Sequence, residues 1–124
     1  MKTVGIYISL VVGLLLNSSA SYADGNKLLQ QCSEVEKVMD GTMTDDKFGA
    51  SFCLGLIGGI QQTVKIVREI SGNEAAINTC IPENVNNGQA VRVVSAYLRA
   101  NPAKLHKDEM VLIILALQEA FPCD

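Results

Sequence analysis

The sequence predicts an all-α fold, a small bundle of four to five helices in two antiparallel hairpins, each closed by a disulfide. Apolar residues recur at helical spacing along most of the chain, and no segment shows the alternation of a strand. Four cysteines are placed around two turn-like segments. With 124 residues, of which 48% are hydrophobic, the chain is long enough for one domain at most.

The first residues have the pattern of a secretory signal peptide. Lys2 gives a positively charged start, Val4 to Leu16 is apolar, and Ser21-Tyr22-Ala23 is a small-x-small cleavage motif. Residues 1–23 are therefore predicted to be removed from the mature protein.

We predict cleavage after Ala23, with Ala20 as the alternative, which leaves residues 24–124 as a single helical domain. The signal resembles a bacterial one in length, so the predicted compartment is the periplasm. Without Lys2, nine basic and thirteen acidic residues remain, with no basic run. Nucleic acid and anionic membrane surfaces are therefore poor partners. Beyond the signal, no stretch is expected to be long and apolar enough to span a membrane.

The first helix of the domain is predicted over residues 26–39. Asn26 is a candidate N-cap. Asp40-Gly41-Thr42 should end the helix, because Gly41 suits a left-handed position after the last turn. The predicted apolar face consists of Leu28, Cys32, Val35 and Met39.

The second helix is predicted over residues 45–70, with Thr44 as its cap. Asp45 and Asp46 in its first turn favour the positive end of the helix dipole. The helix should end near Ser71-Gly72-Asn73. Its predicted buried stripe consists of Phe48, Phe52, Leu56, Ile60, Val64 and Val67.

The centre of this helix is unusually rich in glycine, with Gly55, Gly58 and Gly59 close together. Each glycine in a helix interior costs about 1 kcal/mol relative to alanine, so packing has to compensate. Gly55 and Gly59 lie one above the other at i and i+4. We expect a smooth strip against which another helix lies closely, rather than a ligand site.

The third helix is predicted to begin at Asn84 or Gln89 and to end at Ala100. Cys80-Ile81-Pro82 before it should be extended, because the residue before a proline avoids the helical region. The predicted inner face of the helix consists of Val91, Val94 and Leu98, with Tyr97 at its edge.

Asn101-Pro102 is expected to open a new unit, with the asparagine as cap and the proline at the first helical position. The last helix should carry Asp108 and Glu109 near its start and run to Ala120. Its predicted apolar stripe consists of Met110, Ile113, Ile114, Leu117 and Phe121.

Four cysteines allow three disulfide connectivities. In an antiparallel hairpin, residues equidistant from the turn face each other. The midpoint of Cys32 and Cys53 falls in the first predicted turn, and that of Cys80 and Cys123 falls in the second. We therefore predict Cys32–Cys53 and Cys80–Cys123. A metal site or a redox pair is a poorer interpretation, because no C-x-x-C occurs and the spacings are long.

The sequence does not indicate an enzyme. The single histidine, His106, has no obvious partner for a catalytic triad. The acidic pairs Asp45-Asp46 and Asp108-Glu109 lie at helix starts, where they complement the dipole. No phosphate-binding loop or dinucleotide fingerprint is present, so we predict no catalytic residue, no cofactor and no metal.

Several motifs together resemble a known family. They are Leu-Leu-x-x-Cys at residues 28–32, Phe-Cys-Leu-Gly at 52–55, Cys-Ile-Pro at 80–82, Tyr-Leu-x-x-Asn-Pro at 97–102, and the ending Phe-Pro-Cys at 121–123. This pattern resembles the Rap/Tai family, the immunity proteins that protect bacteria against type VI secretion amidase effectors.

The resemblance implies a periplasmic, all-helical inhibitor without catalytic residues. Such a protein binds a secreted peptidoglycan amidase and occludes its active site, often as a homodimer with one loop entering the cleft. The candidate contact regions are the polar connections at residues 71–78 and 101–107. Within them, the polar groups to test first are Asn73, Glu74, Lys104 and His106.

Two other functions remain open from the sequence. Small disulfide-stapled periplasmic proteins include acid-stress chaperones of the HdeA type, which expose apolar surface at low pH. A non-inhibitory adaptor that shares the fold is the third interpretation. Acid-induced protection of other proteins from aggregation would favour the chaperone, and the absence of an adjacent amidase gene would favour the adaptor.

Overall fold

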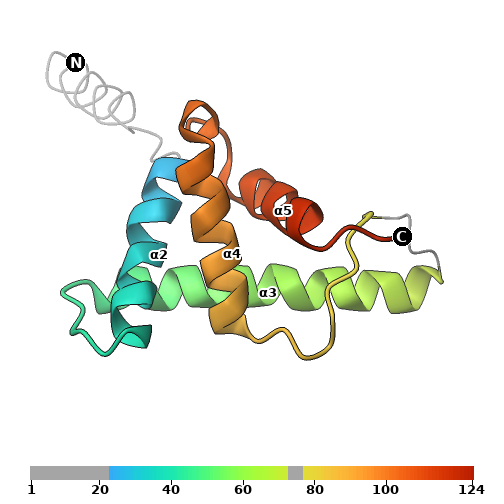
Figure 1. The fold of residues 1–124 in the computed structure, drawn as a ribbon, viewed down its shortest axis with the longest axis horizontal. Helices are drawn as coiled ribbons and strands as arrows, with labels where there is room; N and C mark the ends of the chain where they lie inside the picture. Colours follow the sequence, from blue (N-terminus) through green and yellow to red (C-terminus); the bar gives the residue numbers. More distant parts are fainter. Residues whose placement is uncertain (1–22, 73–76) are drawn as a thin grey trace, which may run out of the picture.

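The computed structural model describes residues 23–72 and 77–124. Within these ranges the chain forms four α-helices and one 3-10 helix: α2 (Gly25–Met39), α3 (Lys47–Ser71), α4 (Asn87–Ala100), η2 (Pro102–Lys104) and α5 (Glu109–Ala120). Figure 1 shows α2 and α4 side by side across α3, with α5 next to α4. The predicted all-α bundle is confirmed.

Both predicted disulfides are present. Cys32 on α2 is bonded to Cys53 on α3, with 5.3 Å between their Cα atoms. Cys80, before α4, is bonded to Cys123, after α5, with 4.9 Å between their Cα atoms. The first bond therefore joins α2 and α3 within the two helices, and the second joins the segment before α4 to the tail after α5. Both are consistent with an exported protein.

The helices begin one or a few residues away from where the sequence predicted. The Asp24 side chain, not that of Asn26, accepts the cap hydrogen bond of α2, from the Lys27 amide. The Asp46 side chain, not that of Thr44, accepts the cap bond of α3, from the Gly49 amide. In both cases a carboxylate, which is a strong acceptor at a helix N-terminus, replaces the predicted cap.

The later helix starts follow the same chemistry. Asn86 caps α4 by accepting from the Gln89 amide. Asp108 caps α5 by accepting from the amides of Met110 and Val111. Asn101 precedes η2 with Pro102 in its first turn, as predicted, but its side chain makes no cap hydrogen bond.

The buried face of α3 differs from the predicted stripe. Phe48 is 80% exposed and Phe52 is 39% exposed, so both predictions are wrong. Because Cys53 is bonded to α2, the face that carries it has to point inward. That face consists of Gly49, Cys53, Ile57, Gly58, Ile60, Gln61 and Val64.

The glycine strip is only partly confirmed. A Cβ atom at Gly58 would lie 2.6 Å from the Asn87 side-chain nitrogen, so this glycine does allow α4 to start close to α3. At Gly55 and Gly59 a Cβ atom would meet nothing within 4 Å. These two glycines lie on the exposed side of α3, and the expected helix packing against them is wrong.

The core lies where the four helices meet. The inner face of α4 is confirmed, and Tyr97 is buried with it. In α5 the stripe is shifted, because Met110 is half exposed. The buried side chains of α5 are Leu112, Ile113, Ala116 and Leu117, with Glu109 at the start of the helix.

Among the described residues, α3 is long and apolar enough to cross a membrane by length and composition. This corrects the expectation that nothing after the signal meets those criteria. The core helix of a bundle passes the same test. α3 carries a disulfide to α2 and buries one face against the other helices, so its apolar composition is explained by packing.

Candidate functional site

The loop between α4 and α5, residues 101–108, is held in place from one side by α4. Lys104 donates a hydrogen bond to the Tyr97 hydroxyl at 3.0 Å. The same ammonium lies 5.1 Å from the centre of the Tyr97 ring, within the range of a cation–π interaction. The Asn101 amide group donates to the Tyr97 carbonyl at 2.9 Å. Lys104 is therefore a partly buried anchor of the loop rather than a freely presented charge.

The start of α2 holds the same loop from the other side. The Gly25 amide donates to the Lys107 carbonyl at 3.1 Å. The Asn26 side chain donates to the Leu105 carbonyl at 3.3 Å. A Cβ atom at Gly25 would lie 2.4 Å from Leu112 and 3.0 Å from Leu105, so only glycine allows this close approach.

His106 is the predicted contact residue that the loop does present. It is exposed, and it lies between the two anchored parts of the loop. Of the four predicted contact residues, the structure brings Lys104 and His106 into one loop, with Lys104 anchored and His106 outward. Asn73 and Glu74 lie outside the described residues.

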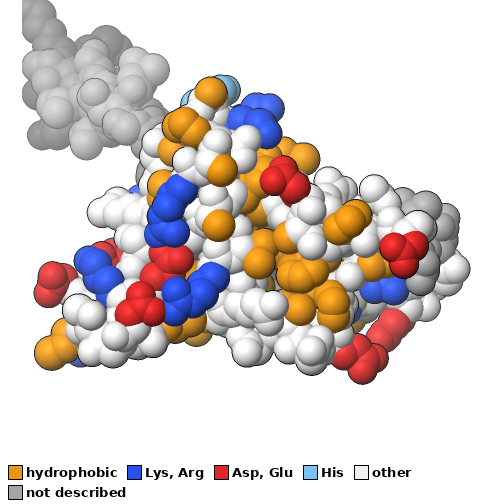
Figure 2. All heavy atoms as spheres, in the orientation of Figure 1, with side chains coloured by type: hydrophobic (Ala, Val, Ile, Leu, Met, Phe, Trp, Pro, Cys, Tyr) orange, Lys and Arg blue, Asp and Glu red, His pale blue; other side chains and the backbone are white. Residues whose placement is uncertain are grey.

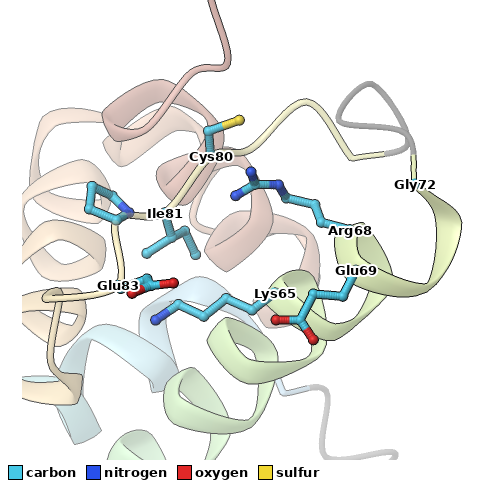
Figure 3. Close-up of a pocket in the computed structure, with 8 residues that line it drawn as sticks. Lys65, Arg68, Glu69, Gly72, Cys80, Ile81 and Glu83 are labelled. Atoms are coloured by element: carbon cyan, nitrogen blue, oxygen red, sulfur yellow. The ribbon is translucent and has the colours of Figure 1, made fainter.

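A hollow of about 610 Å³ lies between the second half of α3 and the extended segment before α4. Half of its lining residues are charged, and Figure 3 shows the Lys65 side chain extending between Glu69 and Glu83. Cys80 holds the segment side of this hollow through its disulfide. The hollow could not be predicted from the sequence, because its lining comes from two segments whose proximity depends on the second disulfide.

The surface shared by α2 and α4 is covered by ion pairs. Arg92 on α4 lies 2.6 Å from the Asp40 carboxylate at the end of α2, and Arg99 contacts Glu36. Hydrogen bonds to these carboxylates raise the pKa of both guanidinium groups. Figure 2 shows the two signs of charge interleaved on this side of the molecule. A surface that neutralises itself in this way offers little to a strongly charged partner.

The connection between α2 and α3 is fixed by one carboxylate. Glu34 accepts hydrogen bonds from Lys37 at 2.6 Å and from the Thr44 hydroxyl at 2.7 Å. The bond from Lys37, followed by the bond from Thr44, lowers the pKa of Glu34. Thr44 in turn accepts from the Asp46 amide at 3.1 Å. Its hydroxyl therefore joins the end of α2 to the start of α3.

Exposed apolar side chains gather near this connection. Met43 is 87% exposed and Phe48 is 80% exposed, and Met39 and Phe52 are exposed to a smaller degree. Met43 lies in the connection itself, and the others lie on the adjoining ends of α2 and α3. Large exposed apolar side chains close together are typical of surfaces that contact other proteins.

The described residues offer no constellation for a metal. Within residues 23–72 and 77–124, no group of three or more His, Cys, Asp or Glu side chains could hold a metal ion. All four cysteines are engaged in disulfides, and none is a free thiol. What the geometry does present is a disulfide-braced scaffold with an anchored polar loop and an apolar surface.

Comparison with known proteins decides the family. The profile described as Rap1a immunity proteins matches residues 24–123. The chain belongs to the Rap1a immunity protein family. No curated protein and no solved structure matches it significantly. Rap1a immunity proteins are non-catalytic inhibitors, and membership implies immunity to a type VI secretion amidase effector. The resemblance stated from the sequence is thereby confirmed.

Proposed function

We propose that this Rap1a family member is a periplasmic protein that binds a type VI secretion peptidoglycan amidase effector and blocks its active site. The observation that carries the proposal is the family match, which covers residues 24–123 and so nearly the whole predicted mature domain. The match favours this function over the acid-stress chaperone and the adaptor. Two disulfides and the signal-peptide pattern support the periplasm as the compartment.

The loop at residues 101–108 is the contact region that the geometry supports best. It is braced by Tyr97 on one side and by the start of α2 on the other. A braced loop loses little conformational freedom on binding, so more of its interaction energy appears as affinity. His106 is the side chain that this loop would place in an amidase cleft, and Lys104 would keep the loop in shape.

The test is inhibition of purified amidases. Oxidised residues 24–124 are titrated into a peptidoglycan hydrolysis assay with each type VI amidase effector encoded in the same genome. We expect one of them to lose its activity at a 1:1 ratio. If every amidase stays fully active at saturating concentrations, the proposed function is wrong. Light scattering of the same sample measures whether the chain is a homodimer.

Single substitutions then locate the contact. We expect His106→Ala to weaken the effector complex about tenfold, the effect of losing a well-placed interface side chain. Gln62→Ala is the matched control, because Gln62 is also exposed but belongs to α3. Asn73→Ala and Glu74→Ala test the other predicted loop. If these two weaken binding while His106→Ala does not, the contact lies at residues 71–78 instead.

A further inference from the structure

One buried carboxylate oxygen has no hydrogen-bond partner within the part of the chain that the structure describes. It is Oε2 of Glu109, a residue in the first turn of α5 that is 6% exposed. Burial raises the pKa of Glu109, and repulsion from Asp108 and then Asp24 adds to the effect. A buried carboxylate without a partner is costly, so the position calls for an explanation.

The two neighbouring carboxylates, those of Asp24 and Asp108, already accept hydrogen bonds from backbone amides. Asp24 caps α2 through the Lys27 amide, and Asp108 caps α5 through the amides of Met110 and Val111. These hydrogen bonds to helix N-termini stabilise both negative charges. Glu109 is the acidic group at this point whose Oε2 atom lacks such a bond.

The peptide bond between Ala23 and Asp24 lies beside the backbone of Glu109. Asp24 and Asp108 form an isolated antiparallel bridge. Within it, the Glu109 amide donates to the Ala23 carbonyl at 3.3 Å. The nitrogen of Asp24 is bonded to that carbonyl carbon, so it lies beside the first residue of α5. Gly25, whose close approach to Leu105 and Leu112 tolerates no side chain, keeps the start of α2 in this position.

We propose that the carboxylate of Glu109 is the binding site for the N-terminal ammonium of the processed protein. The inference rests on the export and cleavage that form part of the proposed function. A signal peptidase hydrolyses the Ala23–Asp24 bond: water adds, the C–N bond breaks, and Ala23 leaves with a carboxylate. The Asp24 amine takes up a proton, and the new positive charge forms beside Glu109.

This assignment explains why an acidic residue is buried at the start of α5. In the unprocessed chain the Asp24 nitrogen is an uncharged amide, and among the described residues Asp108 and Asp24 face Glu109 with like charges. After cleavage the same nitrogen carries a positive charge with three donors, which can satisfy the buried oxygen. The domain therefore reaches its full stability only after the signal peptide has been removed.

The test compares two forms of residues 24–124, one with a free amine at Asp24 and one acetylated there. The acetyl group supplies a carbonyl in place of that of Ala23, so it keeps the acceptor for the Glu109 amide but removes the charge. We expect urea unfolding at pH 6 to give an unfolding constant about tenfold lower for the free amine. Equal stability of the two forms, or a more stable acetylated form, would overturn the proposal.

Substitutions assign the effect to one side chain. In Glu109→Gln we expect the difference between the two forms to disappear. In Glu119→Gln, a change at an exposed position of the same helix, the difference should persist. If the difference persists in Glu109→Gln, another group binds the ammonium and the assignment is wrong.

Two further measurements do not depend on a folded Glu109→Gln variant. In the free-amine form, NMR titration should show the pKa of the α-amino group above its ordinary range of about 7.7–8.0. A value within or below that range contradicts the pairing. The N-terminus of the exported protein, read by mass spectrometry, should be Asp24, and a start at Ser21 would overturn the proposal. None of these readouts involves an amidase, so their failure leaves the immunity function untouched.

Discussion

The two disulfides hold the molecule together in different ways. Cys32 and Cys53 are both fully buried in the core, in the middle of two helices. Cys80 and Cys123 are only partly buried, and they join a segment before α4 to the C-terminal tail. Beside them the Cys80 amide donates to the Phe121 carbonyl at 2.8 Å. The first bond is therefore part of the core, whereas the second is a clasp at the edge of the domain.

We expect the largest effect from removing the core disulfide. It spans 21 residues of sequence, for which loop entropy predicts about 3 kcal/mol of stabilisation. Cys32→Ala with Cys53→Ala also removes two fully buried sulfur atoms, and the resulting cavity should cost about 2 kcal/mol more. Urea unfolding of the double variant measures the sum, about 5 kcal/mol relative to the oxidised protein.

Removing the clasp should cost less, although it closes a longer loop. Its separation of 43 residues predicts about 4 kcal/mol from loop entropy, with little added by cavities at partly exposed positions. Cys80→Ala with Cys123→Ala, unfolded under the same conditions, gives the comparison. A greater loss of stability here than in the core double variant would contradict the distinction between core bond and clasp.

Two glycines of α3 allow the same comparison of a buried with an exposed position, because Gly58 is buried and Gly55 is exposed. Gly55→Ala should stabilise the domain by about 1 kcal/mol, because alanine favours the helix and its methyl group meets open space. Gly58→Ala should lose that gain, because its methyl group would displace the Asn87 side chain. Thermal unfolding of the two variants in parallel checks this. Equal stabilisation by both would show that α4 does not pack closely on Gly58.

The smallest predicted effect is on the pH dependence of stability, and it comes from Glu34 on α2, the helix that carries Cys32. The pKa of Glu34 is lowered in the folded protein by Lys37 and Thr44, so its contribution is complete above its unfolded pKa near 4.5. That contribution is lost as the pH falls through the lowered, folded value. We expect Glu34→Gln to flatten this part of the plot of unfolding free energy against pH. A plot for Glu34→Gln with the same slope as that of the unchanged protein in this pH range would contradict the prediction.

The fold could be predicted because several local signals agreed. Helical periodicity, turn residues and two cysteine pairs placed evenly around two turns all led to the same bundle. The faces of α3 could not be predicted in the same way, because apolar residues surround that helix and periodicity alone does not choose a side. The disulfide at Cys53 decides which face is buried. Because Cys53 is bonded to Cys32 on α2, the face that also carries Gly49 and Ile57 has to point inward.

The candidate site was less accessible from the sequence. The loop at residues 101–107 was predicted, but the role of Lys104 was not, because its anchor on Tyr97 depends on the shape of the loop. Glu109 resembled an ordinary residue of a first helical turn. Its burial results from a backbone pairing between Asp24 and Asp108, residues far apart in the chain, and no local pattern predicts that pairing.

Protection of living cells tests the central claim most directly. A type VI peptidoglycan amidase is directed to the periplasm of a susceptible bacterium, together with either the full chain or residues 24–124 alone. The proposed function predicts that cells survive with the full chain and lyse with the form that lacks the signal, since the inhibitor has to reach the same compartment. Lysis in the presence of the full chain, with every amidase of the same genome, would contradict the proposed function.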